Sequence, residues 1–464
     1  MFLILLLLSR GAFSATFLPV ESPLYQSLAF LEAQGCLKSA ILTVKPLSRA
    51  EVLRLREEAL FSCPRTSAFF EHLRRLSTLF EYSPRLSYLR PLDRLGGELF
   101  LTDLDDQRFA KRFYNRAGEA VKDGLNYRFF WETRAEGEKF SFFLRPTWED
   151  TGNGKKFFFP EAYLVVSGKR LSFLYGRLSQ WWGPGAGADL ILTNNPYPFD
   201  LYLVTNEKPA IIGGWLWRFV FFVSRLERHR AVSRPYFWGA RLVTKPRPFL
   251  EIGLSRSALL GGAGRSSNLK TWLKSFLGKG ENVGRGKPSE PGDQRFAVDL
   301  KLTAAPFGQP LQAYLEVGRE HLVERILYEW AFILGLYLPS CGPWENLSLR
   351  LEYTHTPHNW GVHYLYRSGY TYRGWGVGHH LFRKGHDWWG QLIYQVLPLH
   401  AELELNFERL KSELTGREAR FGLGLRRFTS RGFLEFKGEY FHFRPRMGDE
   451  EEGFFAGLSF SFTW

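Results

Sequence analysis

Apolar and polar side chains alternate with a period of two from about residue 91 to the end of the chain. In residues 296–303 and 347–354 every second side chain is large and apolar, and those between are polar or small. Successive side chains of a strand point to opposite faces, so each of these strands has one apolar and one polar face. A long series of such strands predicts a mainly β chain that closes into an antiparallel barrel with its apolar face towards lipid.

The number of strands follows from where the alternation starts and stops. Amphipathic runs lie near 94–104, 125–134, 138–148, 159–166, 169–178, 213–226, 236–245, 248–257, 294–305, 310–319, 328–337, 346–355, 388–397, 399–410, 416–427, 432–443 and 453–464. A chain whose helical start and C-terminus both lie in the periplasm needs an even number of strands, whereas these runs are odd in number. One further short strand near 201–206 restores the parity, so we predict a transmembrane barrel of about eighteen strands.

Composition agrees with a membrane barrel better than with soluble domains. Of the 464 residues, 45% are hydrophobic and 17% are aromatic. No internal apolar run approaches the roughly 20 residues of a membrane-spanning helix. Aromatic side chains in this quantity are expected at the two membrane interfaces of a barrel. The last strand ends on Trp464, which resembles the terminal signal of bacterial outer-membrane barrels.

The first residues carry a targeting signal. Residues 1–15 hold an apolar run followed by small side chains, and we interpret them as a secretory signal peptide cleaved near Ser14 or Ala15. Export delivers a chain to an oxidising compartment, where cysteines can pair. Cys36 and Cys63 therefore either form a disulfide or remain unpaired, and the sequence leaves both alternatives open.

Residues 16–90 have helical rather than strand spacing. One helix is expected from Pro23, a second is capped by Ser48, and a third covers the apolar positions of residues 69–80. We predict a small periplasmic α-helical bundle that acts as a plug or an assembly handle. The predicted domains are thus a signal peptide, this helical segment and an outer-membrane barrel over residues 91–464.

Three long connections interrupt the barrel pattern, at residues 179–199, 258–294 and 356–387. We expect them to face the exterior or to fold into the lumen as a plug. The second is rich in Gly and Lys and is predicted to be a solvated basic loop.

The stretch 176–199 combines two tryptophans with glycines and proline, so the chain must leave the sheet there in a fixed shape. Aromatic faces beside amide and guanidinium groups suit a sugar surface, and packing of a plug is the alternative. The candidate polysaccharide-binding side chains of this stretch are Arg177, Gln180, Trp181, Trp182, Asn194 and Asn195.

The third connection, 356–387, clusters tyrosines, arginines and histidines. From it we add Tyr366, Tyr370, Arg373 and His379 to the candidate sugar-binding residues. His379, His380, His386 and Asp387 lack a recognised ligand spacing, so we predict no metal and no cofactor.

Several segments together resemble one known family. They are LAFLEAQGCL, PLSRAEVLRL, YGRLSQWWGPGAGADLILTNNPYPF, LEIGLSR, EPGDQRFAVDLKL, LEYTHT and YRSGYTYRGWGVGH, which span nearly the whole mature chain. This set is similar to the capsule assembly Wzi family, and WWGPG with the downstream Asn pair is its most specific part. The resemblance implies an outer-membrane barrel with folded-in loops and a lectin that holds capsular polysaccharide on the cell surface, not an enzyme. The short apolar run at the start and the strongly basic balance depart from the family pattern.

The formal net charge of +14 favours an anionic partner. Capsular or other surface glycans with acidic sugars and the lipids of the outer membrane fit this charge, whereas export disfavours nucleic acid. We expect a monomer. The alternatives are an outer-membrane porin or transporter for anionic solutes and an outer-membrane hydrolase. No Ser and His arrangement forms a recognised hydrolase motif.

Overall fold

The computed structural model describes residues 14–63, 66–78, 87–104, 114–279, 287–288, 290–320 and 330–463. Trp464 and residues 1–13 of the predicted signal peptide lie outside these ranges, so the cleavage position stays a prediction. Ser14 and Ala15 are fully buried, and the Ser14 N–H donates a hydrogen bond of 2.8 Å to the carbonyl of Gly137.

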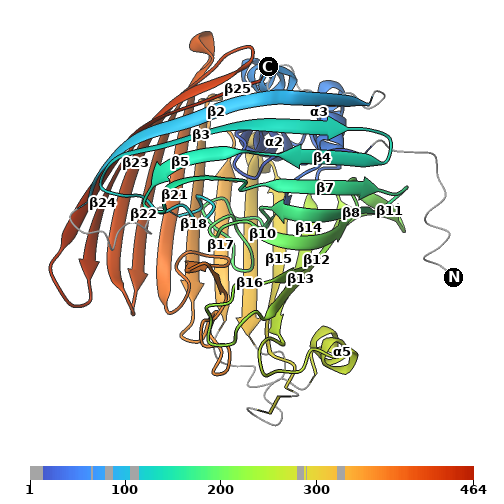
Figure 1. The fold of residues 1–464 in the computed structure, drawn as a ribbon. Coiled ribbons are helices and arrows are strands. Elements are labelled where there is room, and N and C mark those ends of the chain that lie inside the picture. Colours follow the sequence, from blue (N-terminus) through green and yellow to red (C-terminus); the bar gives the residue numbers. More distant parts are fainter. Residues whose placement is uncertain are drawn as a thin grey trace.

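In the described chain, eighteen antiparallel strands close into one barrel (Figure 1). In chain order they are β2 (Tyr88–Leu104), β3 (Gly124–Glu136), β4 (Phe140–Leu144) continued by β5 (Thr147–Thr151), β6 (Gly154–Phe158) continued by β7 (Ala162–Ser167), β8 (Ser172–Leu178), β10 (Phe199–Thr205), β12 (Trp215–Arg225), β13 (Tyr236–Arg247), β14 (Leu250–Leu260), β15 (Asp293–Ala304), β16 (Leu311–Glu320), β17 (Ala331–Leu338), β18 (Leu347–Thr356), β21 (Gly385–Val396), β22 (Ala401–Ser412), β23 (Gly416–Phe428), β24 (Gly432–Pro445) and β25 (Glu451–Thr463). β2 pairs with β25 on one side and with β3 on the other, which closes the barrel. The predicted strand number is confirmed, and the short strand near 201–206 is β10.

The described chain also contains shorter strands, turns and one further helix outside the eighteen barrel strands. They are β1 (Val44–Lys45), β9 (Trp181–Trp182), β11 (Ala210–Ile212), β19 (Thr371–Tyr372), β20 (Trp375–Gly376), the helix α5 (Leu269–Leu277) and two 3-10 turns, η2 (Pro306–Gly308) and η3 (Leu397–Leu399).

The outer wall of the barrel is apolar, as the alternation predicts. On β23, Phe421 is 63% exposed while the neighbouring Arg420 is only 7% exposed. The same holds on β15, where Leu300 faces outwards and Asp299 is buried in the lumen. Side chains that would be costly to leave in water cover the outside, which is the arrangement a lipid environment requires.

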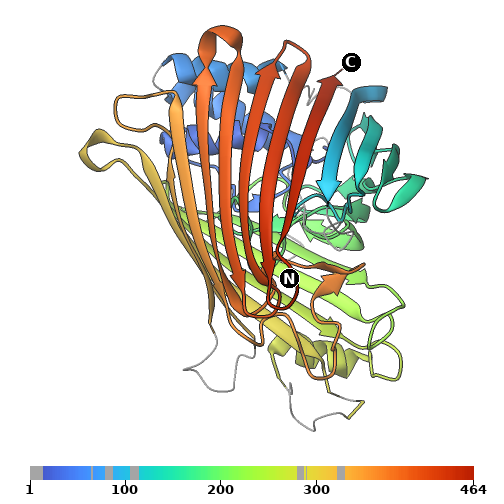
Figure 2. The same ribbon diagram turned by 90° about the vertical axis from the view of Figure 1, so that its left-hand side faces the viewer.

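Three helices lie at the end of the barrel where β25 finishes (Figures 1 and 2). They are α2 (Leu24–Ala33), α3 (Arg49–Ser62) and α4 (Ser67–Thr78). The Ser48 hydroxyl caps α3 by accepting the N–H of Glu51 at 3.2 Å. Cys36 and Cys63 form a disulfide, so the alternative of two unpaired cysteines is wrong. None of the helices within the described ranges is long and apolar enough to cross a membrane.

Buried ion pairs hold the helical segment inside this end of the lumen. Glu32 of α2 contacts Lys245 at 3.0 Å and Lys301 at 2.8 Å, and both lysines project inwards from the wall. Burial alone would raise the pKa of Glu32, but the two lysines outweigh it and bring the pKa down to about 2. Arg75 of α4 pairs in the same way with Glu402 at 2.7 Å. The helices therefore lie inside this end of the barrel and do not form a separate domain outside it.

The long connections lie at the opposite end, where α5 also lies (Figure 1). We call this end the loop end. Residues 179–198 fold from it into the lumen and are called the lumenal loop, and residues 357–384 are called the cap loop. A large hydrophobic core inside the barrel contains Leu190 and Ile191 of the lumenal loop, Tyr370 of the cap loop and Phe222 of the wall.

Candidate functional site

The lumenal loop turns sharply after its two tryptophans. Trp181 and Trp182 form β9, which pairs with β1 of the N-terminal segment. Gly183 follows with a φ of 135°, a conformation that side chains disfavour. The chain reverses there, and the N–H of Gly185 donates to the carboxylate of Asp189 at 2.9 Å. Glycine at this place is therefore a requirement of the loop shape.

Carboxylates from the barrel wall hold the backbone of this loop. Glu352 accepts the N–H of Ala186 at 2.6 Å and that of Gly187 at 3.0 Å. Glu316 accepts the N–H of Leu190 at 3.0 Å. Amides that would otherwise be unpaired in the lumen are thus satisfied by carboxyl oxygens of the wall.

The two tryptophans pack inside the protein. Trp181 and Trp182 are 5% and 0% exposed. The ring of Trp182 lies 5.4 Å from that of Phe222, and its indole N–H donates to Gln180 at 3.4 Å. The indole of Trp181 donates to the Gly185 carbonyl at 3.2 Å. In this conformation the contacts of Gln180, Trp181 and Trp182 stabilise the plug and do not face the exterior.

The two asparagines occupy different surroundings. Asn195 donates to the Gly376 carbonyl at 3.0 Å and accepts the N–H of Asn115 at 3.1 Å, so it joins the lumenal loop to the cap loop and to a third segment. Asn194 is 7% exposed, and its Oδ1 has no hydrogen-bond partner among the described residues. That oxygen belongs to a residue lining the lumenal cavity described below.

The tyrosines of the cap loop are also internal. Tyr366 donates to the Gly261 carbonyl at 2.9 Å, and Tyr370 donates to the Ser257 carbonyl at 3.4 Å. Both rings are buried. Their hydroxyls hold the cap loop against β14 and the connection that follows it.

One buried arginine joins the two loops, and sequence reasoning missed it. Arg295 of β15 donates to the Ile191 carbonyl of the lumenal loop at 2.9 Å and to the Val377 carbonyl of the cap loop at 3.2 Å. Its guanidinium lies 3.7 Å from the centroid of the Tyr370 ring. The only signal in the sequence is the place of Arg295 on the inward face of an alternating strand.

His379 and His380 of the cap loop meet acidic residues of the wall. Within the described residues, His379, His380 and Asp387 form a group whose ligand atoms lie within 4.8 Å of one another. His380 Nε2 lies 2.6 Å from Glu408, and His379 Nδ1 accepts the N–H of Leu381. Burial opposes the charge on His380, but Glu408 outweighs it and raises the pKa of His380 to about 9. Burial lowers the pKa of His379 well below its usual value.

These interactions engage one nitrogen of each histidine, His379 Nδ1 and His380 Nε2. A neutral His379 whose Nδ1 accepts a hydrogen bond carries its proton on Nε2. His380 Nε2 faces Glu408 at 2.6 Å and Asp387 at 3.3 Å, whereas His380 Nδ1 has no hydrogen-bond partner among the described residues. The arrangement suits a charged histidine paired with carboxylates that hold the cap loop on the wall.

Two of the candidate residues reach the surface, Arg177 and Arg373. Arg177 is partly exposed and Arg373 is exposed. Their guanidinium carbons lie 5.2 and 4.2 Å from the centroid of the same Tyr197 ring, and Arg177 also pairs with Asp200 at 2.8 Å. Tyr372 lies 5.3 Å from Arg373. Tyr197 and Tyr372 are themselves buried, at 8% and 4% exposed, so this group presents its two arginines at the loop end and keeps the rings beneath them.

More arginines border this group, and sequence reasoning did not select them. Arg228 and Arg234 are exposed on the connection between β12 and β13. That connection is held to the cap loop, because Arg230 donates to the Gly369 and Thr371 carbonyls, each at 2.6 Å. We call Arg177, Arg228, Arg234, Arg367 and Arg373 the arginine surface. The clustering of four arginines in residues 225–234 is a signal in the sequence that could have indicated this surface and was not used.

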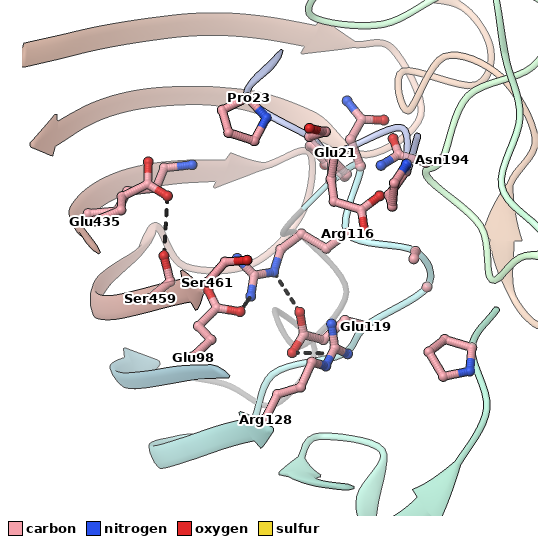
Figure 3. A pocket seen from close by; sticks show the side chains of 18 of the residues that line it. Glu21, Pro23, Glu98, Arg116, Glu119, Arg128, Asn194, Glu435, Ser459 and Ser461 are labelled. Atoms are coloured by element: carbon pink, nitrogen blue, oxygen red, sulfur yellow. Dashed lines mark hydrogen bonds and ion pairs between the residues drawn. The ribbon is translucent and has the colours of Figure 1, made fainter. Parts of the chain in front are cut away.

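The other half of the lumen keeps a cavity of about 540 Å³. Side chains from β2, β3, β5, β6 and β21–β25 line it. Arg116 lies 2.6 Å from Glu98 and 2.7 Å from Glu119, and Figure 3 shows it between the two. Arg128 lies 3.3 Å from Glu119 in the same network. Carboxylates outnumber Arg and Lys in the lining nine to seven. The cavity is therefore polar and slightly acidic, unlike the arginine surface.

Comparison with solved structures places the fold. Wzi of Escherichia coli, described as an outer-membrane protein involved in group 1 capsule assembly and as a carbohydrate-binding β-barrel, matches with a TM-score of 0.74 and 18% identity. The match covers 96% of this chain and 99% of that one. OccK3 (OpdO) of Pseudomonas aeruginosa matches with a TM-score of 0.51 and 12% identity, over 82% of this chain and 96% of that chain.

Sequence comparison gives the family. An uncharacterized 55.8 kDa protein in the cps region of Klebsiella pneumoniae is 24% identical over 321 residues, which are 66% of this chain and 58% of that protein. The family model described as capsule assembly protein Wzi matches residues 103–444, a span from the end of β2 to the end of β24. Because this match covers most of the chain and the barrel of Escherichia coli Wzi shares its fold, the chain belongs to the capsule assembly protein Wzi family.

Proposed function

We propose that this protein lies in the outer membrane and attaches an exported capsular or other anionic surface polysaccharide to the cell. The family and the description of Escherichia coli Wzi as a carbohydrate-binding outer-membrane barrel support the proposal. The apolar outer wall supports the membrane location, since side chains such as Phe421 and Leu458 cover it. On this proposal the helical segment faces the periplasm and the loop end faces the exterior.

The observation that carries the binding proposal is the arginine surface. Arg177 and Arg373 hold their guanidinium groups beside the ring of Tyr197, where they remain accessible from outside. Guanidinium groups pair with carboxylates such as those of uronic acids, and the buried ring of Tyr197 holds two of these groups side by side. We infer that acidic sugars contact these residues, while the buried candidates Gln180, Trp181 and Trp182 keep the loops in place.

The interaction we propose is binding without catalysis. At the arginine surface the exposed groups are cations that lie over the buried rings of Tyr197 and Tyr372. Two carboxylates among them, Asp200 and Glu227, are paired with Arg177 and Arg230. A single closed barrel presents the whole surface, so one chain suffices for binding and we expect a monomer.

A direct test uses the purified barrel in detergent, an acidic capsular polysaccharide rich in uronic acid and neutral dextran as the control. The proposal predicts binding to the acidic polymer that weakens as salt is raised, because exposed charge pairs are screened. It predicts no comparable binding to dextran. Equal binding to both polymers, or binding to neither, contradicts the proposal.

A second candidate function is a porin or transporter for small solutes. The lumenal cavity and the likeness to the OccK3 barrel favour it. Against it, the lumenal and cap loops fill the other half of the lumen and the helical segment fills one end. Single-channel recording in planar bilayers separates the two: a binding barrel is expected to show almost no conductance, whereas a porin shows stable open channels.

A further inference from the structure

The helix α5 packs against the outside of the barrel rather than over its mouth. Trp238 points outwards from β13, yet it is only 2% exposed because α5 covers it. Phe276 of the helix lies 4.9 Å from the Trp238 ring, and Trp272 lies 5.4 Å from the ring of Tyr236. The Trp238 indole donates to Ser275 at 3.0 Å. The helix is thus docked on the wall that we assign to the membrane.

Both ends of this helix are fixed. Asn268 caps the start by accepting the N–H of Thr271 at 2.9 Å, and Gly278 ends it in the left-handed conformation with a φ of 68°. Arg256, which projects outwards from β14, donates to the Phe276 and Ser275 carbonyls at 2.7 and 2.6 Å. α5 is therefore a well-defined helix that is hydrogen-bonded to the outer face of the barrel.

The exposed side of α5 has two stripes. Leu269, Leu273 and Leu277 follow one another at intervals of four and are 75%, 50% and 66% exposed. Lys270 and Lys274 form the neighbouring stripe, also at an interval of four. Three leucines side by side are unfavourable in water but suit the acyl boundary of a bilayer, with lysines at headgroup level.

The position of α5 on the barrel agrees with a leucine stripe in the acyl region and a lysine stripe at the headgroups. The exposed Leu242 of β13 pairs in register with the exposed Leu254 of β14, and both lie on the same outer face as Trp238, closer to the helical end. The leucine stripe therefore continues the lipid-facing wall to the point where the loop end begins. Figure 1 shows α5 at that end, outside the strands.

We propose that α5 is an interfacial helix that lies in the outer leaflet and binds the phosphate groups of a phosphorylated membrane lipid through Lys270 and Lys274. The leucine stripe packs against acyl chains, and the lysines pair with headgroup phosphates. This inference needs the barrel to lie in a membrane, but it does not depend on which polysaccharide the protein binds.

The test measures lipid binding to the detergent-purified barrel by native mass spectrometry, with bis-phosphorylated lipid A as the probe and inorganic phosphate in a parallel sample. We expect lipid A to remain bound to the native chain and inorganic phosphate not to bind. Replacing both lysines (Lys270→Glu with Lys274→Glu) is expected to weaken lipid A binding by roughly tenfold or more, because each lysine near a lipid surface contributes roughly fivefold. The matched control, Lys38→Glu with Lys169→Glu, changes the same charge at exposed positions away from α5 and is expected to bind as the native chain does.

A second measurement tests the leucine stripe. A nitroxide attached at Leu273→Cys, in a Cys341→Ser background, is expected to be accessible to oxygen and shielded from a water-soluble nickel complex in vesicles. If the nitroxide is accessible to the nickel complex, α5 does not lie in the membrane interface. If the double glutamate variant binds lipid A as tightly as the native chain, the two lysines do not form the phosphate site. Binding of inorganic phosphate as tightly as lipid A contradicts the assignment to a lipid. Because acidic polysaccharide binding is measured separately, failure here is distinguishable from failure of the proposed function.

Discussion

The two halves of the lumen differ, although the same alternating strands build both. In the half formed by β8 to β18, inward side chains such as Leu201, Phe222 and Ile333 are apolar and pack against the lumenal loop. In the half formed by β21–β25 with β2 and β3, inward side chains such as Glu404 and Glu435 are charged and line the cavity. The apolar inward side chains of the first half pack against the plug, and charged ones there, such as Glu352 and Arg295, bind its backbone. In the second half the inward charged side chains pair with one another around the cavity.

The largest expected effect comes from removing Trp182, one of the largest fully buried side chains of the packed half. Replacing Trp182 with Ala is expected to cost about 3–5 kcal/mol of stability of the lumenal loop, since a large cavity is left beside Phe222. Ion conductance in planar bilayers should rise while binding of acidic polysaccharide is retained. Asn406→Ala in the cavity half is the control and should leave conductance low. Loss of polysaccharide binding with low conductance would instead assign the tryptophan to sugar recognition.

The disulfide gives the next effect. Cys36→Ser with Cys63→Ser removes a crosslink that spans 27 residues of the helical segment, and we expect a loss of about 2–4 kcal/mol in the stability of that segment. Limited proteolysis of the folded barrel should then cut within α2 to α4. Cys341→Ser is the matched control, because Cys341 is a free cysteine. Equal protease resistance of both variants would show that the ion pairs alone hold the helices.

The cap loop should depend on pH through His380. Although burial opposes the charge, Glu408 raises the pKa of His380 to about 9, above the value of about 6.5 expected in an unfolded chain. A raised folded pKa stabilises the loop fully below about pH 6.5, and this stabilisation, on the order of 3 kcal/mol, is lost as pH rises through about 9. Hydrogen exchange of residues 357–384 should be faster, after correction for intrinsic rates, at high pH.

His380→Gln should remove that pH dependence, whereas His229→Gln at an exposed position should preserve it. A native cap loop whose corrected exchange is the same at pH 6 and pH 10 would show that the histidine pair does not hold it.

The smallest effect is expected at the arginine surface. Arg373→Ala alone should weaken binding of an acidic polysaccharide by about two- to fivefold, because exposed charge and cation–π contacts contribute about 0.5–1 kcal/mol each. Arg417→Ala, an exposed arginine on β23, is the control. Titration by surface plasmon resonance at fixed salt measures the difference. An equal loss in both variants would indicate attraction by net charge without a defined site.

The barrel could be predicted from the sequence because its signal repeats in every strand. The short strand β10 followed from strand parity, and the cap of α3 followed from Ser48. One strand of the packed half departs from the rule that barrel strands are apolar outside and polar inside, and this departure could have predicted the plug. Residues 219–223, FVFFV, are apolar on both faces, which is typical of a strand buried on both sides.

The details of the site were harder to predict, because they depend on which loop residues point inwards. Trp182 and Arg373 belong to the same kind of aromatic and basic loop in sequence, yet one is fully buried and the other is exposed. The partner of Arg295 could not be inferred, since its two carbonyl acceptors lie 104 and 82 residues away in the chain. Long-range contacts of this kind have no local pattern.

The central claim is that the outer arginine surface, and not the lumenal cavity, holds the acidic polysaccharide. The most direct measurement compares the affinity for a purified acidic polysaccharide of two variants, one with Arg177, Arg228, Arg234 and Arg373 all changed to Ala and one with the cavity residue Glu404 changed to Gln. We expect the first to bind more than about tenfold more weakly and with a flatter salt dependence, since four exposed cations are lost. The second should bind as the native chain does. Native affinity in the quadruple variant, with a loss in Glu404→Gln, would contradict this account.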